Sequence, residues 1–191
     1  SDYDITDSAS NLISAGDDVL NVTGVDIVTA SDTSVNANIG AQLNAFTADI
    51  EFDVVDNAAG LIAEMGGADV AGHLTEANSI TVDNGAGSSV VNASDGAMLA
   101  SFTANVDFDV SDTAASIAAE VAAGVASGSG PDSLDEANSV VVESGAAVTA
   151  SQAESIQDIV GYSGAASDYD ITDSASNLIS AGDDVLNVTG V

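Results

Sequence analysis

The sequence predicts an α/β fold in which short strand, helix, strand, helix units repeat along a solenoid with parallel strand stacking. One observation behind this prediction is a stretch of 25 identical residues that occupies both 1–25 and 167–191. Another is a motif of the form (F/Y)D(I/V)xDxAxx(L/I), which occurs four times. The last is a period-two alternation of apolar and polar residues around each motif, which is typical of a half-buried strand.

The motif divides the chain into units of unequal length. Its copies begin at Tyr3, Phe52, Phe108 and Tyr169. Their first aspartates are therefore 49, 56 and 61 residues apart. The expected repeat units are 1–51, 52–107 and 108–166, followed by 167–191 as the start of the next 166-residue period. Connections rich in Gly and Ser contain the differences in length.

The first strand of each unit is predicted to turn its carboxylates toward solvent. Around the start of the second unit, the apolar residues are Ile50, Phe52 and Val54, and the acidic residues between them are Glu51 and Asp53. Residues 106–111 repeat this alternation around the start of the third unit. At the start of the chain, the same pattern predicts that Tyr3 and Ile5 face the core and that Asp4 faces solvent.

A short helix is predicted after each of these strands. The aspartates at positions 7, 56, 112 and 173 lie where a helix N-cap is expected, because a carboxylate there accepts hydrogen bonds from the free N–H groups of the first turn. Helices of about two to three turns need neighbours for stability. The small residues expected to let units approach closely are Ala9, Ala58, Ala59, Ala114 and Ala115.

A second strand and a second helix are predicted further along each unit. The second helix has apolar residues three positions apart, which places them on one helical face. These pairs are Leu43 with Phe46, Leu99 with Phe102, and Ile156 with Ile159.

The charge composition excludes several classes of partner. The chain has no Lys, Arg or Cys, one His and 31 acidic residues, giving a net charge of −31. Each carboxylate must therefore be met by a backbone N–H, a neutral side chain, water or a bound cation. Nucleic acids and anionic membranes would be repelled, and no apolar run is long enough to be inserted in a membrane. Because 46% of the residues are hydrophobic, we expect an ordered chain.

The repeats resemble those of very large surface and secreted proteins of bacteria, common in marine cyanobacteria and other Gram-negative species. The matching stretches are YDITDSASNL, DDVLNVTGV and EANSITVD. The resemblance covers essentially the whole chain and implies a giant, repetitive structural protein at the cell surface or outside the cell. Many such proteins carry GGxGxD calcium repeats. That motif is absent from this sequence, so the resemblance does not imply a calcium solenoid.

An enzyme is not expected. The single histidine, His73, lies in a Gly-rich connection found in one unit only. The sequence contains no thiol, no phosphate-binding loop with its Lys and no HExxH motif. Repeated solvent-facing carboxylates also lack the contrasting environments that an acid and base pair requires. We therefore expect no catalytic and no cofactor-binding residues, with calcium as the one candidate ligand.

Paired carboxylates on the predicted strands are the candidate calcium ligands. They are Asp2, Asp4, Glu51, Asp53, Asp107 and Asp109. Equivalent strands that stack as direct neighbours would place these carboxylates about 5 Å apart, and an intervening strand would double that distance. A close ladder would favour Ca²⁺. The alternative is a solvated acidic face with diffuse Na⁺. Asp17, Asp18 and Asp32 are secondary candidates, with ordinary turn chemistry as the alternative.

Three sequence patterns fit N-glycosylation. They lie at Asn21, Asn92 and Asn187. Chance occurrence in a chain rich in Ser, Thr and Asn is the alternative.

Together these features predict a structural repeat segment of a large extracellular or cell-surface protein that forms a fibre, filament, sheath or surface layer. The expected partner is the protein itself, in a tandem or head-to-tail arrangement. The alternative is a Ca²⁺-dependent adhesin or acidic spacer that presents a binding tip elsewhere in the chain. The extracellular location is favoured because the sequence offers trypsin-like proteases no cleavage site.

Overall fold

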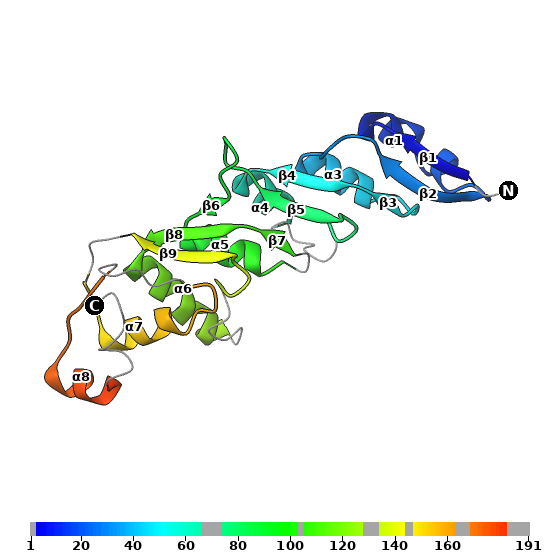
Figure 1. The fold of residues 1–191 in the computed structure, drawn as a ribbon. Helices are drawn as coiled ribbons and strands as arrows, with labels where there is room; N and C mark the ends of the chain where they lie inside the picture. The colour runs from blue at the N-terminus through cyan, green and yellow to red at the C-terminus, as the bar shows by residue number, and fades with distance from the viewer. Residues whose placement is uncertain are drawn as a thin grey trace. The chain divides into compact units, whose positions relative to one another are not determined.

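The computed structural model describes residues 3–65, 74–102, 105–127, 134–143, 147–162 and 169–182. The chain divides into two compact units, one of Ser1–Ser89 with Phe102–Asp107 and the other of Val90–Ser101 with Phe108–Val191. Both units are α/β, with short helices and small parallel sheets, which confirms the α/β class and the parallel strand pairing of the prediction (Figure 1). Among the residues singled out from the sequence, Asp2, His73 and Asn187 lie outside the described residues.

The elements follow one another in a recurring order. The strands are β1 (Tyr3–Asp7), β2 (Val25–Ala30), β3 (Ile50–Glu51), β4 (Asp53–Asp56), β5 (Ser79–Val82), β6 (Val90–Val91), β7 (Val106–Asp107), β8 (Asp109–Thr113), β9 (Ser139–Glu143), β10 (Ala147–Val148) and β11 (Asp170–Ile171). The helices are α1 (Ala9–Ala15), α2 (Asp17–Leu20), α3 (Ala37–Asn44), α4 (Ala58–Met65), α5 (Ala93–Ala100), α6 (Ala114–Ser127), α7 (Ala150–Gln157) and α8 (Ala175–Ala181).

Strand pairing is parallel throughout these sheets. The strand orders are β1-β2-β3, β4-β5-β7, β6-β8-β9 and β10-β11. Parallel neighbours require a crossover connection, and the helices α1, α4 and α6 provide it between the paired strands β1 and β2, β4 and β5, and β8 and β9. The second strand of a repeat also pairs with the strand that opens the next repeat, as in β2 with β3 and β5 with β7.

The alternation predicted for the first strands is confirmed. The side chains of Ile50, Phe52 and Val54 are buried, while Glu51 is exposed and Asp53 is half-buried. Around the start of the third repeat, Val106, Phe108 and Val110 are likewise buried. The core of each of the two compact units therefore consists of the inward faces of these strands and the apolar faces of the helices.

Tyr3 is an exception to this alternation. Its side chain is 49% exposed, whereas Tyr169, which occupies the same position in the identical stretch, is 5% exposed. The environment differs because α7 precedes Tyr169, and Gln157 of that helix donates a hydrogen bond to the Tyr169 hydroxyl at 3.4 Å. The prediction that Tyr3 faces the core is therefore wrong for this copy of the motif.

The predicted helices are present, with differences in extent. Helix α6 is 14 residues long, longer than predicted, because its buried face continues through Ala118 and Val121. The second helix of each repeat ends before the second residue of its predicted apolar pair. Phe46, Phe102 and Ile159 therefore follow helices α3, α5 and α7 rather than lying within them. Two short strands, β6 and β10, precede α5 and α7 and were not predicted.

The alanines near the start of the first helices divide into two classes. Ala9, Ala58 and Ala114 are buried, as predicted, whereas Ala59 and Ala115 are exposed. Successive residues of an α-helix point in directions about 100° apart, so only the first alanine of each pair faces the neighbouring elements.

Candidate functional site

Three aspartates at or just beyond the carboxyl ends of the motif strands join successive repeats. We call Asp56, Asp112 and Asp173 the junction aspartates. In each, Oδ2 accepts a hydrogen bond from the backbone N–H of the first residue of the preceding helix: Ala37 at 3.0 Å, Ala93 at 3.0 Å and Ala150 at 3.1 Å. These helices belong to the preceding repeat, so each bond crosses a repeat junction.

The second oxygen of each junction aspartate binds within its own repeat. Oδ1 accepts a hydrogen bond from the next backbone N–H: Asn57 at 2.8 Å, Thr113 at 2.7 Å and Ser174 at 2.7 Å. A carboxylate has two oxygens and no donor when ionised. One side chain can therefore hold a helix start in one repeat and a strand end in the next.

The helices α3, α5 and α7 need these acceptors because their first N–H groups have no intrahelical partner. Their N-cap residues Asn36, Asn92 and Thr149 accept from the third residue of each helix. The junction aspartates supply an acceptor for the first residue. A negative charge at the positive end of a helix is also favourable.

The predicted N-cap role of these aspartates is wrong by one residue. The N-caps of α1 and α8 are Ser8 and Ser174, and the side chains of Asn57 and Thr113 accept from the first turns of α4 and α6. Asp56 and Asp112 still belong to strands β4 and β8, and Asp173 lies just after β11. At these positions the carboxylates reach the preceding helix instead of capping the following one.

A second set of bonds holds the first helix of a repeat to the strand that follows it. The N–H of Ala9 donates to Asp32 Oδ2 at 2.6 Å, and the N–H of Ala58 donates to Asn84 Oδ1 at 3.0 Å. Asp32 was expected only as a turn residue or a metal ligand. Its offset of two residues beyond β2, which matches that of Asn84 beyond β5, is the signal that could have identified this role.

The hydrogen bonds at the junction favour the ionised carboxylate. The pKa of Asp173 is lowered from its ordinary value by the side-chain amide of Asn177, then by the backbone N–H groups of Ser174 and Ala150. The pKa of Asp7, the equivalent residue in the first motif, is lowered by Asn11 and by the N–H of Ser8. The bond to a preceding helix is therefore the feature that distinguishes Asp173 from Asp7.

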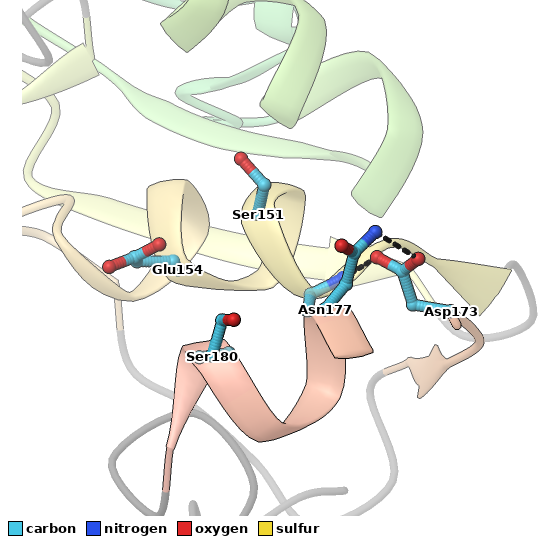
Figure 2. A pocket seen from close by; sticks show the side chains of 7 residues that line it. Ser151, Glu154, Asp173, Asn177 and Ser180 are labelled. Atoms are coloured by element: carbon cyan, nitrogen blue, oxygen red, sulfur yellow. Dashed lines mark hydrogen bonds between the residues drawn. The ribbon is translucent and has the colours of Figure 1, made fainter. Parts of the chain in front are cut away.

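A shallow pocket of about 280 Å³ lies between α7 and α8 beside this junction (Figure 2). Asn177 and Asp173 face each other at one end, joined by a hydrogen bond of 2.7 Å. The pocket is lined by Ala150, Ser151, Glu154, Asp173, Asn177, Ser180 and Ala181. Its charged groups are two carboxylates, so it would not attract an anionic ligand.

The strand carboxylates proposed as calcium ligands have neutral residues as their strand neighbours. Asp53 and Asp109 accept hydrogen bonds of 2.6 Å from the hydroxyls of Ser79 and Ser139 on adjacent strands. Glu51 lies opposite Thr29, and Asp107 lies opposite Thr81. In the sheets β1-β2-β3 and β4-β5-β7, the second strand of the repeat thus lies between the two motif strands. Asp4 is exposed on β1. In the described parts of the chain, no three potential ligands gather as a metal site.

The other candidates were Asp17 and Asp18 for a metal and Asn92 and Asn21 for glycosylation. Asp18 is exposed in the first turn of α2. Asp17 begins α2 and accepts hydrogen bonds from the backbone N–H and the hydroxyl of Thr47, at 2.9 and 3.2 Å. Asn92 is the N-cap of α5, and its amide donates to Asp95 at 2.9 Å. Asn21 is exposed at the end of α2.

Comparisons of the chain with protein-family models, with curated proteins and with solved structures found no match. Over the residues whose structure is described, no helix combines the length and the apolar character needed to cross a membrane.

Proposed function

We propose that this chain is a structural repeat segment whose repeats stack as a solenoid in a fibre, filament, sheath or surface layer outside the cell. The observation that carries the proposal is the recurrence of the same carboxylate bond at three junctions, made by Asp56, Asp112 and Asp173. A bond that joins each repeat to the one before it is what a stacked array needs. A set of independently folded beads has no use for it.

The chemistry of the junction suits a chain without cations. Because Lys and Arg are absent, repeats cannot be joined by ion pairs to those residues. The junction aspartates use backbone N–H groups as their partners, and these groups are available at every helix start. Charge-assisted hydrogen bonds of this kind are stronger than neutral ones. The buried alanines at the helix starts add close packing, since a small side chain lets a helix approach its neighbours.

An extracellular location accords with the same composition. A net charge of −31 keeps a chain hydrated and repels anionic surfaces. A chain with no Lys or Arg has no bond that a trypsin-like protease would cleave. Both properties would serve an abundant protein that is exposed to the surrounding medium.

The proposal is tested with chains of one, two and three 166-residue periods, unfolded by urea at high salt. In a stacked array each added period contributes a further interface, so the unfolding midpoint should rise with length and then level off. The matched controls are the same chains with every junction aspartate replaced by Ala, which should weaken the dependence on length. A midpoint that is independent of the number of periods would show that the repeats are separate beads.

A further inference from the structure

Asn84 and Gly85 form the one Asn-Gly pair in the sequence. An asparagine followed by glycine deamidates most readily, because glycine places no side chain between its backbone nitrogen and the preceding side-chain amide. Both residues are exposed in the loop that follows β5. A Cβ at Gly85 would have no heavy atom within 4 Å apart from those of its chain neighbours. Water can therefore reach both reacting groups.

The side-chain oxygen of Asn84 joins this loop to the start of helix α4. Asn84 Oδ1 accepts a hydrogen bond from the N–H of Ala58, the first residue of α4, at 3.0 Å. In the first repeat a carboxylate makes the same joint, since Asp32 Oδ2 accepts from the N–H of Ala9, the first residue of α1, at 2.6 Å. The fold thus accommodates either an amide or a carboxylate at this position.

The loop also holds the backbone nitrogen that would attack the amide. The N–H of Gly85 donates to Asp83 Oδ1 at 2.8 Å, and the N–H of Gly87 donates to the same oxygen at 3.0 Å. Deamidation requires the Gly85 nitrogen to lose its proton and the Asn84 Cγ to move onto that nitrogen. Both groups are held by hydrogen bonds in the folded chain, so the fold restrains the reaction.

We propose that Asn84–Gly85 is a self-modification site, at which deamidation replaces the amide of the joint between β5 and α4 with a carboxylate like that of Asp32. The reaction adds one negative charge to a chain of charge −31. Its rate is set by how often the loop releases the two reacting groups. This inference goes beyond the proposed function and does not depend on how the repeats assemble.

The reaction has two steps and consumes water. The Gly85 nitrogen bonds to Asn84 Cγ, the bond from Cγ to Nδ2 breaks, and Nδ2 leaves as ammonia with the proton of the Gly85 nitrogen. The chain then carries a succinimide ring. Water opens the ring and returns a proton to the Gly85 nitrogen. Attack of water at Cγ gives aspartate, whereas attack at the main-chain carbonyl carbon gives isoaspartate.

The two products differ in their effect on the joint. Aspartate at position 84 leaves the main chain unchanged and presents a carboxylate to the N–H of Ala58, and a charged acceptor makes the stronger hydrogen bond. Isoaspartate lengthens the main chain by one methylene and displaces the side-chain oxygen from the helix start. The first product therefore strengthens the joint, and the second loosens it.

Ageing the full chain in mildly alkaline buffer tests the site. Peptide mapping by mass spectrometry should find the exchange of NH₂ for OH first at Asn84, with both aspartate and isoaspartate as products. Asn57 and Asn92 are internal controls, because they are also exposed but are followed by alanine. A folded chain that ages without modification at Asn84, or that is modified first at another asparagine, would overturn the inference.

Ala58→Pro tests whether the fold sets the rate. Proline lacks the N–H that Asn84 Oδ1 accepts, and it is tolerated at the first position of a helix. Loss of this hydrogen bond should raise the rate at Asn84 by roughly 2- to 10-fold. Ala114→Pro is the matched control, because it makes the same change at the start of α6 and should leave the rate at Asn84 unchanged.

Asp83→Ala is a second release variant that does not place proline in the buried helix start. It removes the acceptor of the Gly85 N–H and should also raise the rate at Asn84. Circular dichroism verifies that each variant is folded. A folded release variant that deamidates at or below the rate of the parent chain would show that the loop does not restrain the reaction.

Asn84→Asp presents the aspartate product without isoaspartate. Because Asp32 makes the same joint in the first repeat, the urea unfolding midpoint of this variant should equal or exceed that of the parent chain. The measurement is made at high salt, which screens repulsion between the new carboxylate and Asp83. A lower midpoint would show that the joint requires an amide and would overturn the proposed replacement.

Discussion

The carboxylate of Asp112 accepts a 3.0 Å hydrogen bond from the backbone N–H of Ala93, which joins the end of strand β8 to the start of helix α5. Ala93 is fully buried, and the N–H of a first helical residue has no partner within its helix. A buried N–H without an acceptor is costly. The bond therefore connects the packing of a helix in one repeat to the strand that opens the next.

Replacing Asp112 with Ala should lower the free energy of unfolding by about 1–3 kcal/mol, since it leaves the buried N–H of Ala93 unpaired. Asp112→Asn should lower it less, because Asn84 already holds the N–H of Ala58 with an amide oxygen. Urea unfolding followed by circular dichroism measures both. Asp107→Ala is the control, because Asp107 is exposed on β7 and such substitutions change stability by about 0.5 kcal/mol or less. Equal losses for Asp112→Ala and Asp107→Ala would contradict the junction role.

The duplicated tyrosines allow the same substitution in two environments. Tyr169→Ala removes a ring that is 5% exposed, and loss of a buried aromatic side chain costs about 3–5 kcal/mol. Tyr3→Ala removes a ring that is 49% exposed and should cost well under half as much. Hydrogen exchange of the amides in α8 and α1 reports each local stability. Similar increases in exchange for the two variants would show that the two copies have the same neighbours.

The strands and helices, with their buried faces, can largely be predicted from the sequence, because the same apolar pattern recurs in each repeat. The alternation of Ile50, Phe52 and Val54 with acidic residues predicts a strand with one buried face, and the structure buries those three side chains. Ala9 and Leu12 are three positions apart, which places them on one helical face, and both are buried in α1. These predictions succeed because each depends on one element and its period.

The errors concern contacts between elements. Aspartate is a preferred N-cap residue, so the sequence predicts that Asp112 caps the helix that follows it, α6. Only the position of α5 shows that the Asp112 carboxylate bonds to that preceding helix instead. The exposure of Tyr3 has the same origin, because its sequence is identical to that of Tyr169 and only the neighbours differ. The second strands also could not be placed between the first strands from their composition. Local sequence does not specify which elements become neighbours.

The second helices α3 and α5 contain closely packed glycines, Gly40 and Gly96, where a larger side chain should be destabilising. A Cβ at Gly96 would lie 2.7 Å from Cγ2 of Val110, and a valine in a strand cannot move away easily. Gly96→Ala should therefore destabilise the chain by about 1 kcal/mol or more, although Ala favours helix formation over Gly. The comparison is Gly85→Ala, where positive φ rather than packing is the obstacle. Thermal unfolding of the two variants compares the cost of a steric clash with the cost of backbone strain. A stabilised Gly96→Ala chain would show that this contact relaxes readily.

The α7–α8 junction should weaken in acid. The pKa of Asp173 in the folded chain is below its ordinary value of 3.8, so its ionised form is favoured by folding. This contribution is fully present above pH 3.8 and is lost as the pH falls through the lower pKa of the folded state. Asn177→Ala removes the largest cause of the shift and should raise the pKa of Asp173, as measured by carbon NMR of its carboxyl group. Asn11→Ala should raise the pKa of Asp7 and leave that of Asp173 unchanged, and any other pattern would contradict this assignment.

The serine hydroxyls beside the strand carboxylates predict how cations affect the stability of the chain. Ser79 and Ser139 lie on the strands beside Asp53 and Asp109, so each of these carboxylates meets a hydroxyl on that strand rather than a second carboxylate. Repulsion in a chain of charge −31 is then relieved by diffuse screening. We expect NaCl and CaCl₂ at matched ionic strength to raise the unfolding temperature by similar amounts. The double variant Asp53→Asn with Asp109→Asn should preserve that similarity. If Ca²⁺ raises the unfolding temperature much further than Na⁺, and this excess disappears in the double variant, the strand carboxylates bind calcium specifically.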